Sequence, residues 1–155
     1  MTPVGLKQLI SDEGVRLTVY DDATGLPIVP GTRVIGHPTI GIGRALDVRG
    51  ITAAETAYLL NNDMLDFTKS LLATYPWFAR LTPTRQDVLT NMAFNLGPTG
   101  FAGFRKMLAA LVAGDYFKAA EEILDSKAAR QLPARYERLA NAMALNSYVD
   151  PLTPR

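Results

Sequence analysis

The sequence predicts an α+β fold, in which a small antiparallel sheet lobe is joined by a long helix to a helical-bundle lobe. Between residues 15 and 44, β-branched residues alternate with turn residues too often for a helix to persist. From residue 51 onward, apolar residues recur at helical spacing. The chain has 155 residues, a length that suits one domain with its own core. We therefore expect a single domain over 1–155.

The sheet lobe is expected over residues 14–50 and follows a short helix over residues 3–12. Thr2 is a suitable N-cap for that helix, Pro3 suits its first position, and Gly14 stands just beyond its end. The runs "TVYDDATG", "PIVPG", "GTRVIGHP" and "TIGIG" then combine β-branched residues with turn residues. They predict short strands joined by tight turns.

The bridging helix is expected over residues 53–74, and the helical lobe over residues 76–148. Thr52 with Glu55 three residues later forms a capping box. The helical lobe is expected to contain helices that begin near Pro83, Phe104, Asp115 and Pro133, with stops at Gly97 and Gly114. The helix over 3–12 is expected to pack on this lobe, and the tail "DPLTPR" to fray.

Composition excludes several classes of function. Sixteen basic side chains nearly balance fifteen acidic ones, so there is no overall basic charge for nucleic acid or anionic lipid. The chain has no cysteine, which excludes disulfides, thiolate metal sites and a thiol nucleophile. The single histidine, His37, is expected to be an ordinary surface or core residue, since no set of metal ligands accompanies it. We expect no metal and no cofactor.

Neither an export signal nor a membrane anchor is visible in the sequence. The start "MTPVGLKQLISDEG" lacks a basic flank followed by a long apolar segment. The longest apolar run, "MLAALVA", is far shorter than the roughly 18 residues of a spanning helix. We therefore expect the protein to accumulate where it is made.

Two acidic pairs, Asp12–Glu13 and Asp21–Asp22, stand at either end of an apolar run. Considered singly, the first pair suits a solvated helix end and the second suits a turn, because aspartate is an ordinary turn residue. The nearby "TIGIGR" is not a phosphate loop, since Leu46 occupies the third glycine position of that motif. Spacing alone therefore favours a structural role for these acids.

Three segments taken together change this interpretation. "DEGVRLTVYDD", "PTIGIGR" and "NMAFNLGPTGFAGF" resemble, in the same order, the phage lysozymes of the T-even type, glycoside hydrolase family twenty-four. The resemblance covers nearly the whole chain. It implies a lysozyme-like fold and hydrolysis of the β-1,4 bond between N-acetylmuramic acid and N-acetylglucosamine in peptidoglycan. It also implies a catalytic set of Glu13, Asp22 and Thr39.

The chemistry of glycoside hydrolysis suits this set. An inverting enzyme needs an acid that protonates the leaving oxygen and a carboxylate roughly 6.5 to 9.5 Å away that activates water. Because the family is inverting, the resemblance assigns Glu13 as general acid, Asp22 as the base-side carboxylate and Thr39 as a holder of the water. Asp12 and Asp21 are then structural neighbours.

The resemblance also implies substrate-binding roles for Phe94, Asn95 and Arg135. Phe94 and Asn95 match cleft residues that contact the glycan, and Arg135 matches an arginine placed against the catalytic glutamate. Without the resemblance, Phe94 would be assigned to a helix core, and Asn95 and Arg135 to the solvated surface.

The chain also departs from the family. Ala23 to Pro38 form an insertion where the short form has a tight turn, and such insertions alter the rim of a site more readily than its core. Met107 and Glu122 replace polar residues that touch substrate. Arg44 replaces a histidine, and we expect it to pair with Asp63 on the bridging helix.

The expected partner is the glycan strand of peptidoglycan, bound by a monomer that needs no nucleic acid or membrane anchor. An endolysin of this type waits in the host cytoplasm and reaches the periplasm and cell wall after a holin opens the inner membrane. The alternative is a catalytically inactive, glycan-binding lysozyme-like protein of a phage particle. Nucleic-acid binding is disfavoured, because no helix carries a basic face with base-reading residues at its start.

Overall fold

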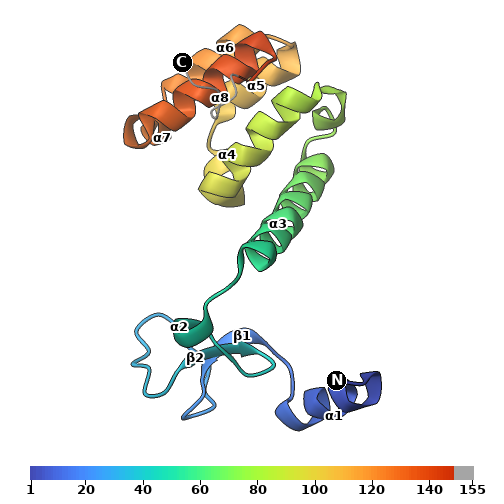
Figure 1. Cartoon of the computed structure of the whole chain (residues 1–155). Helices are drawn as coiled ribbons and strands as arrows, with labels where there is room; N and C mark the ends of the chain where they lie inside the picture. The colour runs from blue at the N-terminus through green and yellow to red at the C-terminus, as the bar shows by residue number, and fades with distance from the viewer. Residues whose placement is uncertain (149–155) are drawn as a thin grey trace, which may run out of the picture. The chain divides into compact units, whose positions relative to one another are not determined.

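The computed structural model describes residues 1–148 and confirms the predicted α+β class (Figure 1). The chain divides into two compact units, Met1–Tyr58 and Leu59–Arg155. We call them the sheet unit and the helical unit. The division falls within helix α3, Ala53–Thr74, whose bounds agree with the predicted bridging helix.

The sheet unit begins with helix α1, Pro3–Glu13, and continues into a three-stranded antiparallel sheet of order β1-β2-β3. The strands are β1 (Arg16–Asp21), β2 (Pro38–Gly41) and β3 (Arg44–Ala45). Helix α1 is capped as predicted, because the Thr2 hydroxyl accepts from the Gly5 N–H at 3.1 Å. Gly14 ends it with φ 71°, a conformation that glycine adopts without strain.

The strand register places the acidic pair next to the start of β2. Tyr20 lies opposite Thr39, and Asp21 lies opposite Pro38. The insertion therefore begins at the end of β1 and ends at the start of β2, which pairs with that end of β1. Its predicted strand "PIVPG" contributes only an isolated bridge between Tyr20 and Pro27.

The sheet unit also fixes the start of α3. Glu55 accepts from both the backbone N–H and the hydroxyl of Thr52, each at 2.8 Å, which confirms the predicted capping box. Glu55 also binds Arg44 at the start of β3, with Nη2–Oε1 at 2.6 Å. The prediction that Arg44 pairs with Asp63 is therefore wrong: the capping glutamate takes the guanidinium.

The helical unit contains most of α3 and the later helices: η1 (Phe78–Arg80), α4 (Pro83–Ala102), α5 (Arg105–Ala113), α6 (Tyr116–Leu124), α7 (Lys127–Gln131) and α8 (Pro133–Leu145). The predicted stop at Gly97 is a kink inside α4, where this glycine has φ 69° and Pro98 follows. Asp115 caps α6 by accepting from the Lys118 N–H at 2.8 Å. Helix α7 and the four-residue α2 (Leu46–Arg49) were not predicted, because they are too short to show a helical period.

The apolar core lies in the helical unit, where α8 packs on α4, α6 and α7 (Figure 1). Its fully buried side chains are Phe78, Val88, Leu89, Met92, Ala119, Ile123, Tyr136 and Met143. No helix in the described part of the chain is long and apolar enough to cross a membrane. The packing of residues 3–12 on the helical lobe stays a prediction, and the predicted fraying of "DPLTPR" lies outside the described residues.

Candidate active site

Glu13 is the last residue of α1, and its side chain is exposed. Its carboxylate lies beside the turn between β2 and β3, since a methyl group at Gly43 would stand 3.6 Å from Oε2. Asp12, its neighbour, instead accepts from the Gln8 side chain of the same helix at 2.8 Å. Of this pair, Glu13 is the acid that lies against the sheet.

Asp21 is buried, with 2% of its surface exposed, and its carboxylate is saturated by backbone donors. Oδ1 accepts from the N–H groups of Ala23 and Gly36 at 3.0 Å each, and Oδ2 accepts from that of Ile35 at 2.7 Å. The Ile35 N–H contributes most to lowering the pKa of Asp21, against the opposing effect of burial. This aspartate folds the insertion back onto the strand.

Asp22 is exposed and has a more open environment. Its Oδ1 accepts from the His37 N–H at 2.6 Å, and its own N–H donates to the His37 carbonyl at 3.1 Å. Among the described residues, no hydrogen bond engages Oδ2. One oxygen of Asp22 is therefore fixed, and the other can accept a proton from water.

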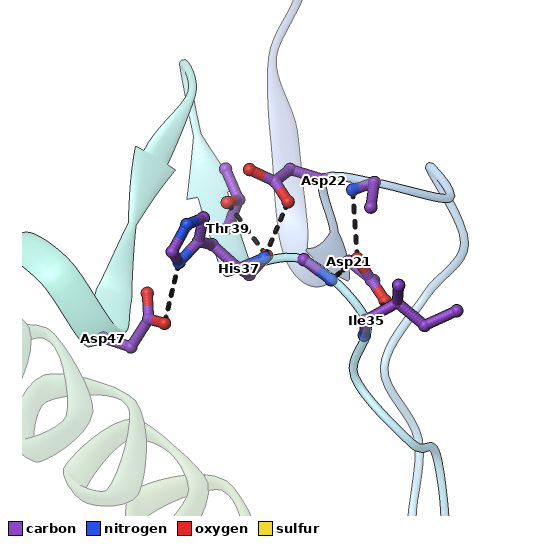
Figure 2. Close-up of polar contacts among 8 residues, drawn as sticks. Asp21, Asp22, Ile35, His37, Thr39 and Asp47 are labelled. Carbon is purple, nitrogen blue, oxygen red and sulfur yellow. Dashed lines mark hydrogen bonds and ion pairs between the residues drawn. The ribbon is translucent and has the colours of Figure 1, made fainter.

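Thr39 lies in β2 with 3% of its surface exposed, and its hydroxyl donates to the same His37 carbonyl at 3.1 Å. A hydroxyl that donates in this way keeps its lone pairs as acceptors. Figure 2 shows Asp22 and Thr39 joined through the backbone of His37. Sequence reasoning missed this link, because a backbone contact leaves no mark in residue types.

His37 is an exposed surface residue, as expected, and its imidazole contacts a carboxylate. Its Nδ1 lies 2.8 Å from Oδ2 of Asp47 on α2, and both side chains are about half exposed. The hydrogen bond and charge of Asp47 raise the pKa of His37, and the pKa of Asp47 is lowered in turn. No group of three His, Cys, Asp or Glu side chains suited to a metal ion occurs within residues 1–148.

The predicted substrate residues Phe94 and Asn95 lie on α4 of the helical unit. Phe94 is 42% exposed, so it is not a core residue. Its ring packs edge to face with that of Phe67, with the ring centroids 5.8 Å apart. The Asn95 Oδ1 accepts from the Tyr136 hydroxyl at 2.9 Å, which orients the amide. Phe94 therefore presents a partly exposed aromatic ring next to an oriented amide.

Arg135 lies on α8 and binds Asn91 on α4. Its Nη2 and Nε donate to the Asn91 Oδ1 at 2.7 and 3.2 Å. This bond places the guanidinium on the same two helices that carry Asn95 and Tyr136. The pairing of Arg135 with Glu13 stays a prediction.

The helical unit also contains an open cavity of about 680 Å³ formed by α4, α5, α6 and α7. Met107 and Glu122, which replace polar residues of the family pattern, both line it. Lys118 Nζ lies 3.2 Å from the Glu122 carboxylate and 2.9 Å from that of Glu121, so the two acids share one lysine of their own helix. The rim also carries Arg105, Lys106, Asp125 and Lys127.

Comparison with known proteins identifies relatives among phage proteins. The family model described as phage lysozyme matches residues 11–139. The pre-baseplate central spike protein Gp5 of Enterobacteria phage T4 is 31% identical over 150 residues, which cover 86% of this chain and 26% of that protein. The endolysin of Salmonella phage P22 is 31% identical over 109 residues, which cover 64% of each chain. The chain thus spans less than two thirds of either relative.

Proposed function

Because the chain belongs to the phage lysozyme family, we propose that it is an endolysin that hydrolyses peptidoglycan. The bond cleaved is the β-1,4 linkage between N-acetylmuramic acid and N-acetylglucosamine. The similarity to an endolysin over 64% of the chain supports this activity. The observation that carries the proposal is the joint attachment of Asp22 and Thr39 to the His37 backbone.

In the proposed reaction, Glu13 protonates the leaving glycosidic oxygen while water attacks the opposite face of the sugar. The Asp22 Oδ2 takes one proton of this water, and the Thr39 oxygen accepts a hydrogen bond from the other. The exposure of Glu13 and Asp22 supports these roles, because both carboxylates are open to substrate. Their separate environments support a division of work between acid and base.

Substrate contacts are proposed for three side chains of the helical unit. The exposed ring of Phe94 offers an apolar edge to a sugar, and the oriented amide of Asn95 offers a hydrogen bond. Arg135 is proposed to lie against Glu13, as the family resemblance implies. No cofactor enters the reaction.

The biological setting is part of the same proposal. The protein acts as a monomer and waits in the host cytoplasm. It reaches the periplasm and the cell wall after a holin opens the inner membrane. The family membership of the chain supports this route.

A second candidate function is that of a glycan-binding component of a phage particle that does not cleave its ligand. The similarity of 86% of this chain to a central spike protein favours it. The presence of Glu13, Asp22 and Thr39 together argues for activity instead. The two functions differ in whether new sugar ends appear.

The test is the identity of those ends. Purified protein is incubated with isolated Gram-negative sacculi, and the products are reduced with borohydride and analysed by mass spectrometry. Reduced muramic acid ends are expected, because a muramidase exposes that sugar. Reduced glucosamine ends, or anhydromuramic acid, would contradict the proposal. Retention on sacculi without new ends would favour the particle component.

A further inference from the structure

The insertion Ala23 to Pro38 encloses the acidic pair from one side. Three consecutive backbone N–H groups of its last turn point at these two side chains: those of Ile35 and Gly36 at Asp21, and that of His37 at Asp22. Figure 2 shows Ile35 beside Asp21 and His37 beside Asp22. We call residues 35–37 the cradle.

The burial pattern of the sheet unit agrees with this view. Within the described residues of this unit, the two with less than a tenth of their surface exposed are Asp21 and Thr39. Both are polar, and both are hydrogen-bonded to the cradle. The buried centre of this unit is therefore a polar network formed by Asp21, Thr39 and the cradle, beside the exposed Asp22. Such a network is rigid only when all of its members are satisfied.

Gly36 permits the close approach. A Cβ atom at this position would overlap the Asp22 Oδ1 and stand 2.8 Å from the Cβ of Ala23. The cradle therefore lies against the Asp22 carboxylate with no space for a side chain. Any movement of the cradle changes the position of that carboxylate.

The far end of the cradle is fastened by the ion pair of His37 with Asp47. Helix α2, which carries Asp47, follows β3 directly. The pair thus ties the end of the insertion to the short helix that follows the last strand. The charged groups that face the imidazole are Asp47 from α2 and, more weakly, Asp22 and Asp21 from the end of β1.

We propose that the pair of His37 and Asp47 is a charge-dependent latch that positions Asp22 and Thr39 for water activation. This inference rests on the proposed function and gives the insertion a role in it. His37 is a positioning residue: its backbone holds both groups, and its imidazole holds that backbone in place. The latch weakens when the imidazole becomes neutral, because a hydrogen bond between charged groups is stronger than one with a neutral donor.

The direction of the pH effect follows from the two pKa shifts. The pKa of His37 is raised above its ordinary value of 6.5, so the latch is complete below pH 6.5 and weakens as pH rises through the raised value. The pKa of Asp47 is lowered below its ordinary value of 3.8, so the latch is lost only at strongly acidic pH. Activity is therefore expected to fall on the alkaline side with the titration of His37.

The first experiment follows the His37 signals by NMR as a function of pH and does not depend on enzymatic activity. The chain has one histidine, so its imidazole signals are unambiguous. In the wild type, the backbone N–H signal of His37 is expected to shift with the same pKa as the imidazole and to exchange faster at alkaline pH. In Asp47→Asn, the imidazole pKa is expected to fall toward 6.5, and the N–H to exchange faster at every pH.

The second experiment measures kcat and KM on soluble peptidoglycan strands from about pH 5 to about pH 9. Asp47→Asn is expected to lower kcat about two- to fivefold at mildly acidic pH, the range of an exposed ion pair, with little change in KM. It is also expected to remove the alkaline inflection. His37→Arg keeps a positive charge at all these pH values and is expected to retain activity on the alkaline side.

Asp66→Asn is the matched control, since Asp66 also forms an exposed ion pair, with Lys69 at 3.6 Å, and belongs to the helical unit. An unchanged His37 N–H signal in Asp47→Asn would overturn the latch, whatever the activity. An unchanged pH profile of kcat in that variant would overturn its role in positioning. Absence of cleavage by the wild type at every pH would refute the proposed function instead, and the N–H signal would still decide on the latch.

Discussion

Arg44 binds Glu55 with two nitrogens, Nη2 to Oε1 at 2.6 Å and Nη1 to Oε2 at 3.1 Å. The same glutamate caps α3 through Thr52, and the same arginine donates to the Gly50 carbonyl at 2.9 Å. One carboxylate therefore joins the end of the sheet to the start of the long helix. Arginine suits this position because its planar fork matches a carboxylate and stays charged.

A double-mutant cycle of Arg44→Ala and Glu55→Ala is expected to show coupling in urea unfolding. The pKa of Glu55 is lowered, first by the Thr52 N–H and also by Arg44. Its contribution is therefore complete above its ordinary value of 4.5 and lost as pH falls through the lowered value. The coupling should be equal at about pH 6 and about pH 8, unlike that of a histidine pair. The losses in the free energy of unfolding caused by Asp63→Ala and Arg44→Ala should be additive. Coupling of Arg44 with Asp63 and not with Glu55 would instead support the pairing predicted from the sequence.

Glu13→Gln is expected to lower the rate of peptidoglycan cleavage by on the order of 10²- to 10⁴-fold, because the amide cannot transfer a proton to the leaving oxygen. The fold should stay intact, since the carboxylate is exposed at the end of α1. Asp12→Asn is the control, as Asp12 bonds only within its own helix in the described structure. Equal losses in both variants would contradict the assignment of Glu13 as the acid.

Asp22→Asn and Asp21→Asn are expected to fail in different ways. The first should reduce cleavage about a hundredfold or more with an unchanged unfolding midpoint, since it removes the proposed base. The second should lower the urea midpoint. The NH₂ group of the asparagine would face a backbone N–H that now donates a hydrogen bond to Asp21, and two donors cannot pair. Greater loss of activity per folded molecule in Asp21→Asn would reverse the two roles.

The stability of the wild type is expected to respond to acid through Asp21. Its pKa is lowered, so its contribution is present above the ordinary value of 3.8 and lost as pH falls below it. Asp21→Asn should therefore flatten the acid limb of the curve of unfolding midpoint against pH. An unchanged acid limb would mean that other carboxylates control acid unfolding.

The fold was predicted best where the signals are local. The caps at Thr2 and Thr52 and the stop at Gly14 correctly set the bounds of α1 and α3, since capping depends on a few adjacent residues. The conformation of the insertion was not predicted, because it depends on backbone N–H groups that bond to a side chain 14 or 15 positions away. The partner of Arg44 was missed for a related reason, since Glu55 had already been assigned to the cap.

The site shows the same division. The resemblance selected Glu13, Asp22 and Thr39, and the structure links the last two through His37, a residue that no motif of the sequence marked. Residue types reveal side-chain chemistry, whereas the atoms of His37 that meet Asp22 and Thr39 are backbone atoms. Only the presence of Gly36 beside it signals a close approach of the chain.

Gly36→Ala is expected to impair both stability and activity, since the added methyl group would displace the Asp22 carboxylate or the backbone at Ala23. Arg33→Ala, in the same loop and exposed, is the control. The measurements are urea unfolding and cleavage of sacculi. A Gly36→Ala variant with the activity and stability of the wild type would show that the cradle moves away without consequence.

The stereochemistry of the product tests the role of Asp22 in the wild type. If its Oδ2 activates a water held with Thr39, the water attacks the face opposite the leaving group, and the β-linked sugar is released as the α-anomer. Products sampled by NMR within the first minutes, before the anomers equilibrate, should therefore show the inverted form. The control is the purified product, equilibrated in the same buffer, which gives the anomer ratio without enzyme. A β-anomer in excess at early times would indicate that a carboxylate, in place of water, attacks the sugar, and Asp22 would then be a nucleophile.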